Sequence, residues 1–194
     1  MGHERREQHV ALRVVAGVGS LRTSRALAIA HAAIAAVHTR EFRIVHFNLL
    51  ANHLHLILEA ASAHARARGM QRLEVRLVRR LNRLLGRRGP LFDDRYYTRS
   101  LTTPTAVRNA LAYVLLDGNR HELEHGAEQV WYGVDAYSSG YWFDGWADER
   151  WQHEVTHARR PTAEATTWLL RSGWRLAGGA IAFDTYYRSI SAST

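Results

Sequence analysis

The feature that most constrains the fold is a pair of short apolar segments separated by only two residues. Residues 43–50 (RIVHFNLL) and 53–59 (HLHLILE) each have the length and composition of a β-strand. Ala51 and Asn52 between them leave room only for a turn. The two segments are therefore predicted to form a β-hairpin, around which the rest of the chain is arranged.

Five further segments have recognisable periodicity or composition. Apolar residues at helical spacing predict helices, and short β-branched or aromatic runs bounded by turn residues predict strands. The predicted elements are a strand at 9–15, a helix at 25–38, a helix at 65–85, a strand at 95–101 and a helix at 104–117 that ends at Gly118.

The predicted order, β-α-β-β-α-β-α, is typical of an α+β fold of the ferredoxin-like, split-βαβ type with an antiparallel sheet. We expect residues 1–121 to form this domain. The polar stretch HELEHGAEQ after it is predicted to be a linker. Residues 122–194 are expected to form an aromatic-rich extension, either packed on the core or partly flexible, with a short helix after Pro161.

The charge pattern favours a nucleic-acid partner. The chain has a formal net charge of +8, and all 26 of its basic residues are arginine. Arginine binds phosphate and guanine through a planar fork of donors, although codon bias would give the same composition. With no cysteine, any metal must be held by histidine and carboxylate. No apolar run reaches the roughly 18 residues of a membrane span, so we expect a cytoplasmic protein without membrane contact.

The hairpin carries the first candidate site residues. Because side chains alternate along a strand, His53 and His55 lie on one face and Leu54 and Leu56 on the other. Two imidazoles on one face can bind a divalent cation, but the same spacing also occurs on an ordinary half-exposed sheet. The other histidines, including His46, are interpreted as structural or exposed.

The last predicted helix carries a tyrosine and a carboxylate one turn apart. Tyr113 and Asp117 are four residues apart and therefore lie on the same side of the helix. Asp117 could supply a third metal ligand, and Tyr113 could place its hydroxyl beside a bound phosphodiester. Packing of the tyrosine on the sheet, with Asp117 as a helix-terminal residue, is the alternative.

Several segments in order resemble the single-tyrosine transposases of the HUH endonuclease superfamily, including the branch associated with repetitive extragenic palindromes. The resemblance covers about residues 8–121. Its motifs are the His53-Leu54-His55 triplet, the basic segment NRLLGRRG at 82–89, the segment FDDRY at 92–96 and the helix that bears Tyr113.

The resemblance implies that His53, His55 and Asp117 bind Mg²⁺ or Mn²⁺ and that Tyr113 is the nucleophile. Single-stranded or hairpin DNA would be cut and rejoined through a 5′-phosphotyrosyl intermediate. Many relatives have Asn or Gln where this chain has Asp117. The residues predicted to contact DNA are Arg76, Arg79, Arg80, Arg83, Arg87, Arg88, Arg95, Tyr96, Tyr97 and Arg99.

Other interpretations remain open. The chain could be a catalytically inactive, domesticated protein that binds hairpin DNA on the same fold, or a metallohydrolase of small phosphoesters. Tyr96 and Tyr97 are rival nucleophiles, although neither has a carboxylate one helical turn away. A monomer or a homodimer is expected, with the site formed within one chain or between two.

Overall fold

The structure is a computed structural model that describes residues 5–93, 95–124, 133–148 and 159–183. Its centre is a sheet in which every strand pairing is antiparallel. The strands are β1 (Arg6–Arg13), β2 (Phe42–Leu49), β3 (His53–Ala60) and β4 (Tyr97–Ser100), in the spatial order β2-β3-β1-β4. This order and the two helices between the strands confirm the predicted α+β, ferredoxin-like fold.

Strand register decides which side chains share a face. Residue Ala11 of β1 lies opposite His55 of β3 and also opposite Tyr97 of β4. Directly opposed residues point to the same face of a sheet, so the odd-numbered residues of all three strands share one face. The even-numbered Val10, with the leucines of β3, faces the other way.

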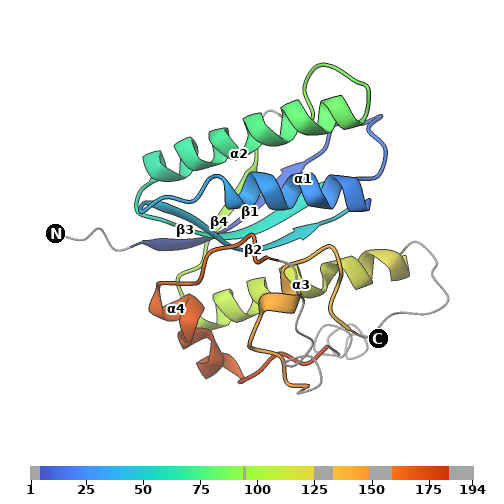
Figure 1. Cartoon of the computed structure of the whole chain (residues 1–194). Helices are drawn as coiled ribbons and strands as arrows, with labels where there is room; N and C mark the ends of the chain where they lie inside the picture. The colour runs from blue at the N-terminus through green and yellow to red at the C-terminus, as the bar shows by residue number, and fades with distance from the viewer. Residues whose placement is uncertain (1–4, 94, 125–132, 149–158, 184–194) are drawn as a thin grey trace.

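Helices α1 (Ser24–Ala35) and α2 (Ala63–Leu84) cover the face with Val10 (Figure 1). Each begins at a hydroxyl cap: Thr23 accepts a hydrogen bond from Ala26 N, and Ser62 accepts one from Ala65 N. Leucines spaced along α2 bury its inner side against the sheet, which leaves Arg79, Arg80 and Arg83 exposed.

The opposite face is covered by α3 (Pro104–Glu124) and by segments that follow it in the chain (Figure 1). These segments include the short helices η1 (Gly140–Trp142), α4 (Trp168–Arg171) and η3 (Gly173–Ala177). Trp146 and Trp174 are each only 1% exposed there. The aromatic cluster of the extension thus forms much of the second core, against α3.

A buried carboxylate attaches the extension to β3. Glu59 is fully buried and accepts hydrogen bonds from Thr166 N at 2.7 Å and Thr167 N at 2.9 Å. The hydroxyls of both threonines also donate to it. These hydrogen bonds satisfy a charge that would otherwise be costly to bury.

The predicted end of α3 at Gly118 is wrong, because the helix continues to Glu124. Gly118 is instead a point of close packing. A Cβ added there would lie 1.7 Å from Asp135 Oδ2, and Asp135 forms a bidentate ion pair with Arg22. Residues 121–124 of the predicted linker are therefore helical, and residues 125–132 lie outside the described part of the chain.

The remaining boundaries differ slightly from prediction. The first strand begins at Arg6 and ends at Arg13, because its pairing with β3 extends to the Arg6–Ala60 position. The fourth strand is shorter than expected. In the part of the chain that the structure describes, no helix is long and apolar enough to cross a membrane.

Candidate active site

The two histidines of the hairpin lie on the face covered by α3. The rings of His53 and His55 are stacked with their centroids 5.8 Å apart. His53 is partly exposed, and its Nδ1 lies 2.8 Å from the side-chain oxygen of Asn52. His55 is only 6% exposed. The pair thus extends from the rim of the site into its interior.

A third histidine, predicted from the sequence to be structural or exposed, joins this pair. His9 of β1 is on the same face, and its Nε2 lies 3.1 Å from Nδ1 of His55. Their rings are stacked with centroids 5.3 Å apart. The sequence did not indicate this contact, because only the pairing of β1 with β3 brings His9 beside His55.

The environment of His9 keeps it uncharged at neutral pH. Burial, and secondarily the positive charge of Arg99, lower the pKa of His9 to about 4. A neutral imidazole has one donor and one acceptor nitrogen. Its Nε2 can therefore accept a hydrogen bond from Nδ1 of His55 or donate one to it, depending on the tautomers of both rings.

Helix α3 brings Tyr113 and Asp117 to the histidines. The Tyr113 ring meets the His55 ring edge-on at a centroid distance of 5.3 Å and the His9 ring at 5.7 Å. Asp117 Oδ2 is 3.8 Å from Nε2 of His55, and both side chains are nearly buried. Segments from β1, β3 and α3 therefore converge at His55.

A buried amide holds α3 at this position. Asn48 of β2 lies opposite His55 in the sheet and is fully buried. Its Nδ2 donates to the carbonyl oxygen of Val114 at 2.8 Å. Because Val114 follows Tyr113, this bond fixes the helix beside the histidine face.

The donor chemistry of this site fits a divalent cation, since imidazole nitrogen and carboxylate oxygen are common ligands of such ions. The present side-chain arrangement does not form a closed ligand set. Within the described ranges, no three His, Cys, Asp or Glu side chains gather closely enough to hold a metal ion. His55 and Asp117 are already close, so a cation site would require a third ligand to approach this pair.

Strand β4 supplies an aromatic and a cationic side chain at the same face. Tyr97 is 59% exposed and meets the His9 ring edge-on at 6.3 Å. Arg99 lies opposite His9 in the register and is exposed. Tyr96, in contrast, packs against the core below α1 and α2, and Arg95 is exposed before the strand. Tyr97 is thus the closer rival of Tyr113.

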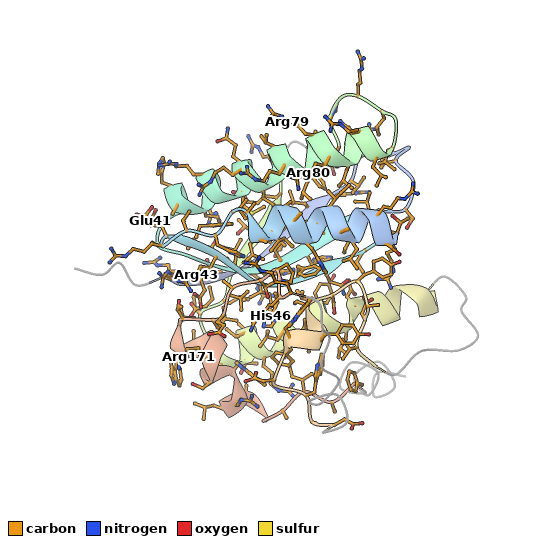
Figure 2. All side chains as sticks on the ribbon, viewed as in Figure 1. Glu41, Arg43, His46, Arg79, Arg80 and Arg171 are labelled. Atoms are coloured by element: carbon orange, nitrogen blue, oxygen red, sulfur yellow. The ribbon has the colours of Figure 1, made fainter. Side chains whose placement is uncertain are left out.

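The arginines of α2 lie on the other side of the sheet from Tyr113. Arg79 and Arg80 are exposed and lie at α2 in Figure 2, whereas His46 lies across the sheet near α3. Arg76 and Arg83 belong to the same helix. The predicted DNA-contacting residues therefore form two separate surfaces, one on α2 and one on β4.

The loop after α2 runs from the helix to the end of the sheet where His53 lies. Leu91 O accepts a hydrogen bond from Val15 N just beyond β1, where Arg13 lies opposite His53. Arg88 in this loop is exposed. Arg87 donates to the side-chain oxygen of Asn82 and to the carbonyl of Pro90, so it also stabilises the loop.

Comparison with known proteins gives one informative likeness. No family model matches the chain, and a search of curated proteins finds no significant match. Among solved structures, the fold is similar to that of a REP-associated tyrosine transposase bound to a REP hairpin. The TM-score is 0.51 at 15% sequence identity, over 69% of this chain and 76% of that one. This likeness shows a shared fold.

Proposed function

We propose that the protein is a tyrosine-dependent DNA strand transferase that cuts and rejoins single-stranded or hairpin DNA. The observation that carries the proposal is the convergence of Tyr113 and Asp117 with His55 on one face of the sheet. These groups come from segments more than 50 residues apart in the sequence. The similar solved fold, that of a transposase bound to a REP hairpin, supports the same substrate class.

In the proposed reaction, the Tyr113 hydroxyl oxygen attacks the phosphorus of a phosphodiester. A bond forms between this oxygen and phosphorus, and the bond from phosphorus to the 3′ oxygen breaks. The phenolic proton is lost and the departing 3′ oxygen takes up a proton. The products are a 5′-phosphotyrosyl link and a free 3′-hydroxyl, and attack by another 3′-hydroxyl reverses the step.

The proposed cofactor is Mg²⁺ or Mn²⁺, held by His53, His55 and Asp117. When bound, such an ion stabilises the negative charge that develops on the phosphate oxygens. His9 would act as a positioning residue, because its Nε2 contacts Nδ1 of His55 and so sets the orientation of that ring. Asn48 would hold the nucleophile helix against the same face.

Arginines and aromatic rings at both surfaces would bind the DNA. Tyr97 and Arg99 lie beside the candidate site, where a stacking ring and a cation suit an unpaired nucleotide near the scissile phosphate. The exposed arginines of α2 lie on the opposite face of the sheet, where they would contact the phosphate backbone of a paired stem.

A second candidate function is hairpin recognition without cleavage. It is favoured by the absence of a preformed three-residue metal cluster in the described part of the chain. The two functions share the fold and the basic surfaces. They differ in whether a covalent protein–DNA species ever forms.

The distinguishing experiment uses the purified protein, Mn²⁺ and a pool of labelled hairpins with randomised single-stranded flanks. Strand transfer predicts a denaturant-resistant adduct that depends on Mn²⁺. Peptide mapping of this adduct should place the nucleotide on the peptide that contains Tyr113. Salt-sensitive binding with no adduct at any flank sequence would favour the non-catalytic function.

A further inference from the structure

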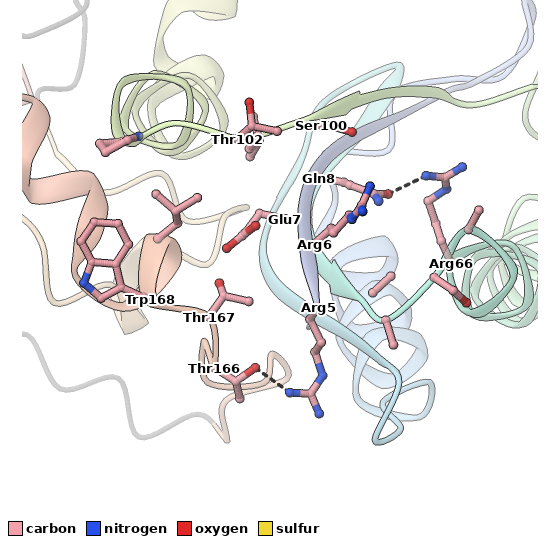
Figure 3. Close-up of a pocket in the computed structure, with 17 residues that line it drawn as sticks. Arg5, Arg6, Glu7, Gln8, Arg66, Ser100, Thr102, Thr166, Thr167 and Trp168 are labelled. Carbon is pink, nitrogen blue, oxygen red and sulfur yellow. Dashed lines mark hydrogen bonds between the residues drawn. The ribbon is translucent and has the colours of Figure 1, made fainter. Parts of the chain in front are cut away.

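A pocket of about 1210 Å³ lies beside the first half of β1, away from the candidate active site (Figure 3). It is bordered by the starts of α2 and α3 and by α4. None of the histidines, tyrosines or carboxylates assigned to the candidate site lines it. Its polar lining residues include side chains of both charges, so the pocket can hold a ligand that has both anionic and N–H groups.

The negative side of the pocket is a buried carboxylate without a donor. Glu7 is only 8% exposed, and among the described residues nothing forms a hydrogen bond or ion pair with its side chain. Its neighbour Glu59, directly opposite in the sheet, is fully satisfied by Thr166 and Thr167. The Glu7 oxygens are not among the described side-chain atoms that are buried without a partner, so they are accessible from the pocket. There they can accept hydrogen bonds from the N–H groups of a ligand.

The positive side lies across β1. In Figure 3, Arg6 and Arg66 lie on the side of the strand opposite to Glu7. Arg66 donates one hydrogen bond to Gln8, and its Nε is buried without a partner. Arg6 is exposed. Two guanidinium groups, one at the start of β1 and one in the first turn of α2, provide a surface for a phosphate.

An aromatic ring completes the pocket on the side of Glu7. Trp168, the first residue of α4, is 58% exposed. The α4 segment is fixed in place, since the preceding Thr167 is hydrogen-bonded to Glu59. An exposed indole on a fixed segment is a suitable surface for stacking a planar ring.

We propose that this pocket binds one unpaired guanine nucleotide of the DNA strand, an inference that rests on the proposed function for the identity of the ligand as DNA. A nucleotide combines a phosphate, a planar ring and an edge with N–H groups. Guanine presents two adjacent donors, N1–H and N2–H, on its Watson–Crick edge, which match the two oxygens of Glu7.

The position of the pocket agrees with this assignment. Glu7 and His9 are on the same face of β1, two residues and therefore about 7 Å apart along the strand. A strand held at the candidate site can extend along the exposed strand β4, past Arg99, to the pocket, which Ser100 and Leu101 line. Guanine would be read a short distance from the scissile phosphate.

The test measures binding of fluorescent single strands of twelve thymidines, each with one central replacement by dG, dA, dC or deoxyinosine. The protein is the full chain with Tyr113→Phe, in EDTA, so no cleavage contributes. The dG strand should bind about 5- to 100-fold more tightly than the all-thymidine strand. Deoxyinosine, which lacks the N2 amino group, should give an intermediate affinity.

Glu7→Gln should reduce the preference for dG, expressed as the ratio of the variant's own dissociation constants for the all-thymidine and dG strands, to less than twofold. Glu41→Gln, an exposed site outside the pocket, is the matched control and should retain the preference. Trp168→Ala, at an exposed position, should weaken binding of the dG strand at least fivefold. A dG preference that is absent, or that survives Glu7→Gln, would overturn the proposal.

Failure of the pocket and failure of the proposed function are distinguishable. A dG preference lost on Glu7→Gln, in a protein whose Tyr113 forms no adduct, would support the pocket and refute strand transfer. An adduct on Tyr113 in a protein without any dG preference would support strand transfer and refute the guanine pocket.

Discussion

The Nε2 atom of His9 lies 3.1 Å from the Nδ1 atom of His55, although the two residues are 46 positions apart. This contact joins the second strand of the hairpin to β1 within the candidate site. His55 in turn lies against Tyr113 and Asp117. The contact with His9 therefore influences how the His55 ring is oriented towards Tyr113 and Asp117 on α3.

Replacement of His9 tests its positioning role. His9→Phe keeps a ring but removes the hydrogen bond to His55, so the Mn²⁺ affinity should fall about 10-fold or more, as for other groups that orient metal ligands. His9→Gln, which can place a polar atom near the position of Nε2, should remain within about threefold of wild type. Isothermal titration calorimetry measures both. Equal affinities of His9→Phe and the exposed control His64→Phe would contradict the role.

A buried histidine outside the site predicts sensitivity to acid. Burial lowers the pKa of His46 to about 3, with a smaller contribution from Arg160, and its Nδ1 lies 3.1 Å from Ser139 Oγ. The native pKa is below the unfolded value, so the unfolded state binds the extra proton as pH falls below about 6.5. The stability that the neutral form contributes is complete above that pH and is lost towards pH 3.

His46→Gln should reduce this dependence. Between pH 7 and 5, the variant's free energy of unfolding should fall by about 2 kcal/mol less than that of wild type. Urea denaturation at both pH values measures the difference. The exposed His64→Gln should behave as wild type. An unchanged pH dependence in His46→Gln would show that this imidazole is not held neutral.

Gly118 provides a test of packing within α3. Alanine is normally better than glycine in a helix by about 1 kcal/mol. Here an added Cβ would lie 1.7 Å from Asp135 Oδ2 and would displace the ion pair with Arg22. Gly118→Ala should therefore destabilise the protein by about 2–4 kcal/mol. Asn109→Ala at an exposed position of α3 is the control, and a stabilising Gly118→Ala would refute the contact.

The attachment of the extension through Glu59 can be tested by hydrogen exchange. Glu59→Gln removes the negative charge and replaces one of the two oxygens that together accept hydrogen bonds from the backbone N–H groups and hydroxyls of Thr166 and Thr167. We expect a loss of about 1–3 kcal/mol and faster exchange around residues 166–171. Exposed Glu164→Gln should leave both unchanged. Exchange as slow as in wild type would mean that Glu59 does not hold this segment.

Sequence patterns predicted the elements whose residues alternate or repeat locally, including the hairpin and the helices on either side of it. The same patterns could not place His9, because its contact with His55 depends on the long-range register of β1 and β3. They also ended α3 at Gly118, since the reason for glycine there is Asp135, seventeen residues later in the chain. Which face each helix covers is likewise a tertiary property. The arginines of α2 and the candidate nucleophile therefore lie on opposite sides of the sheet.

The most direct test of the central claim compares two tyrosine variants that flank His9. Wild-type protein, Tyr113→Phe and Tyr97→Phe are each incubated with Mn²⁺ and a hairpin that wild type cleaves, and the denaturant-stable adduct is quantified. We predict no adduct with Tyr113→Phe, retained hairpin binding, and an adduct with Tyr97→Phe. An adduct that persists in Tyr113→Phe, or that disappears only in Tyr97→Phe, would contradict the assignment of Tyr113 as the nucleophile.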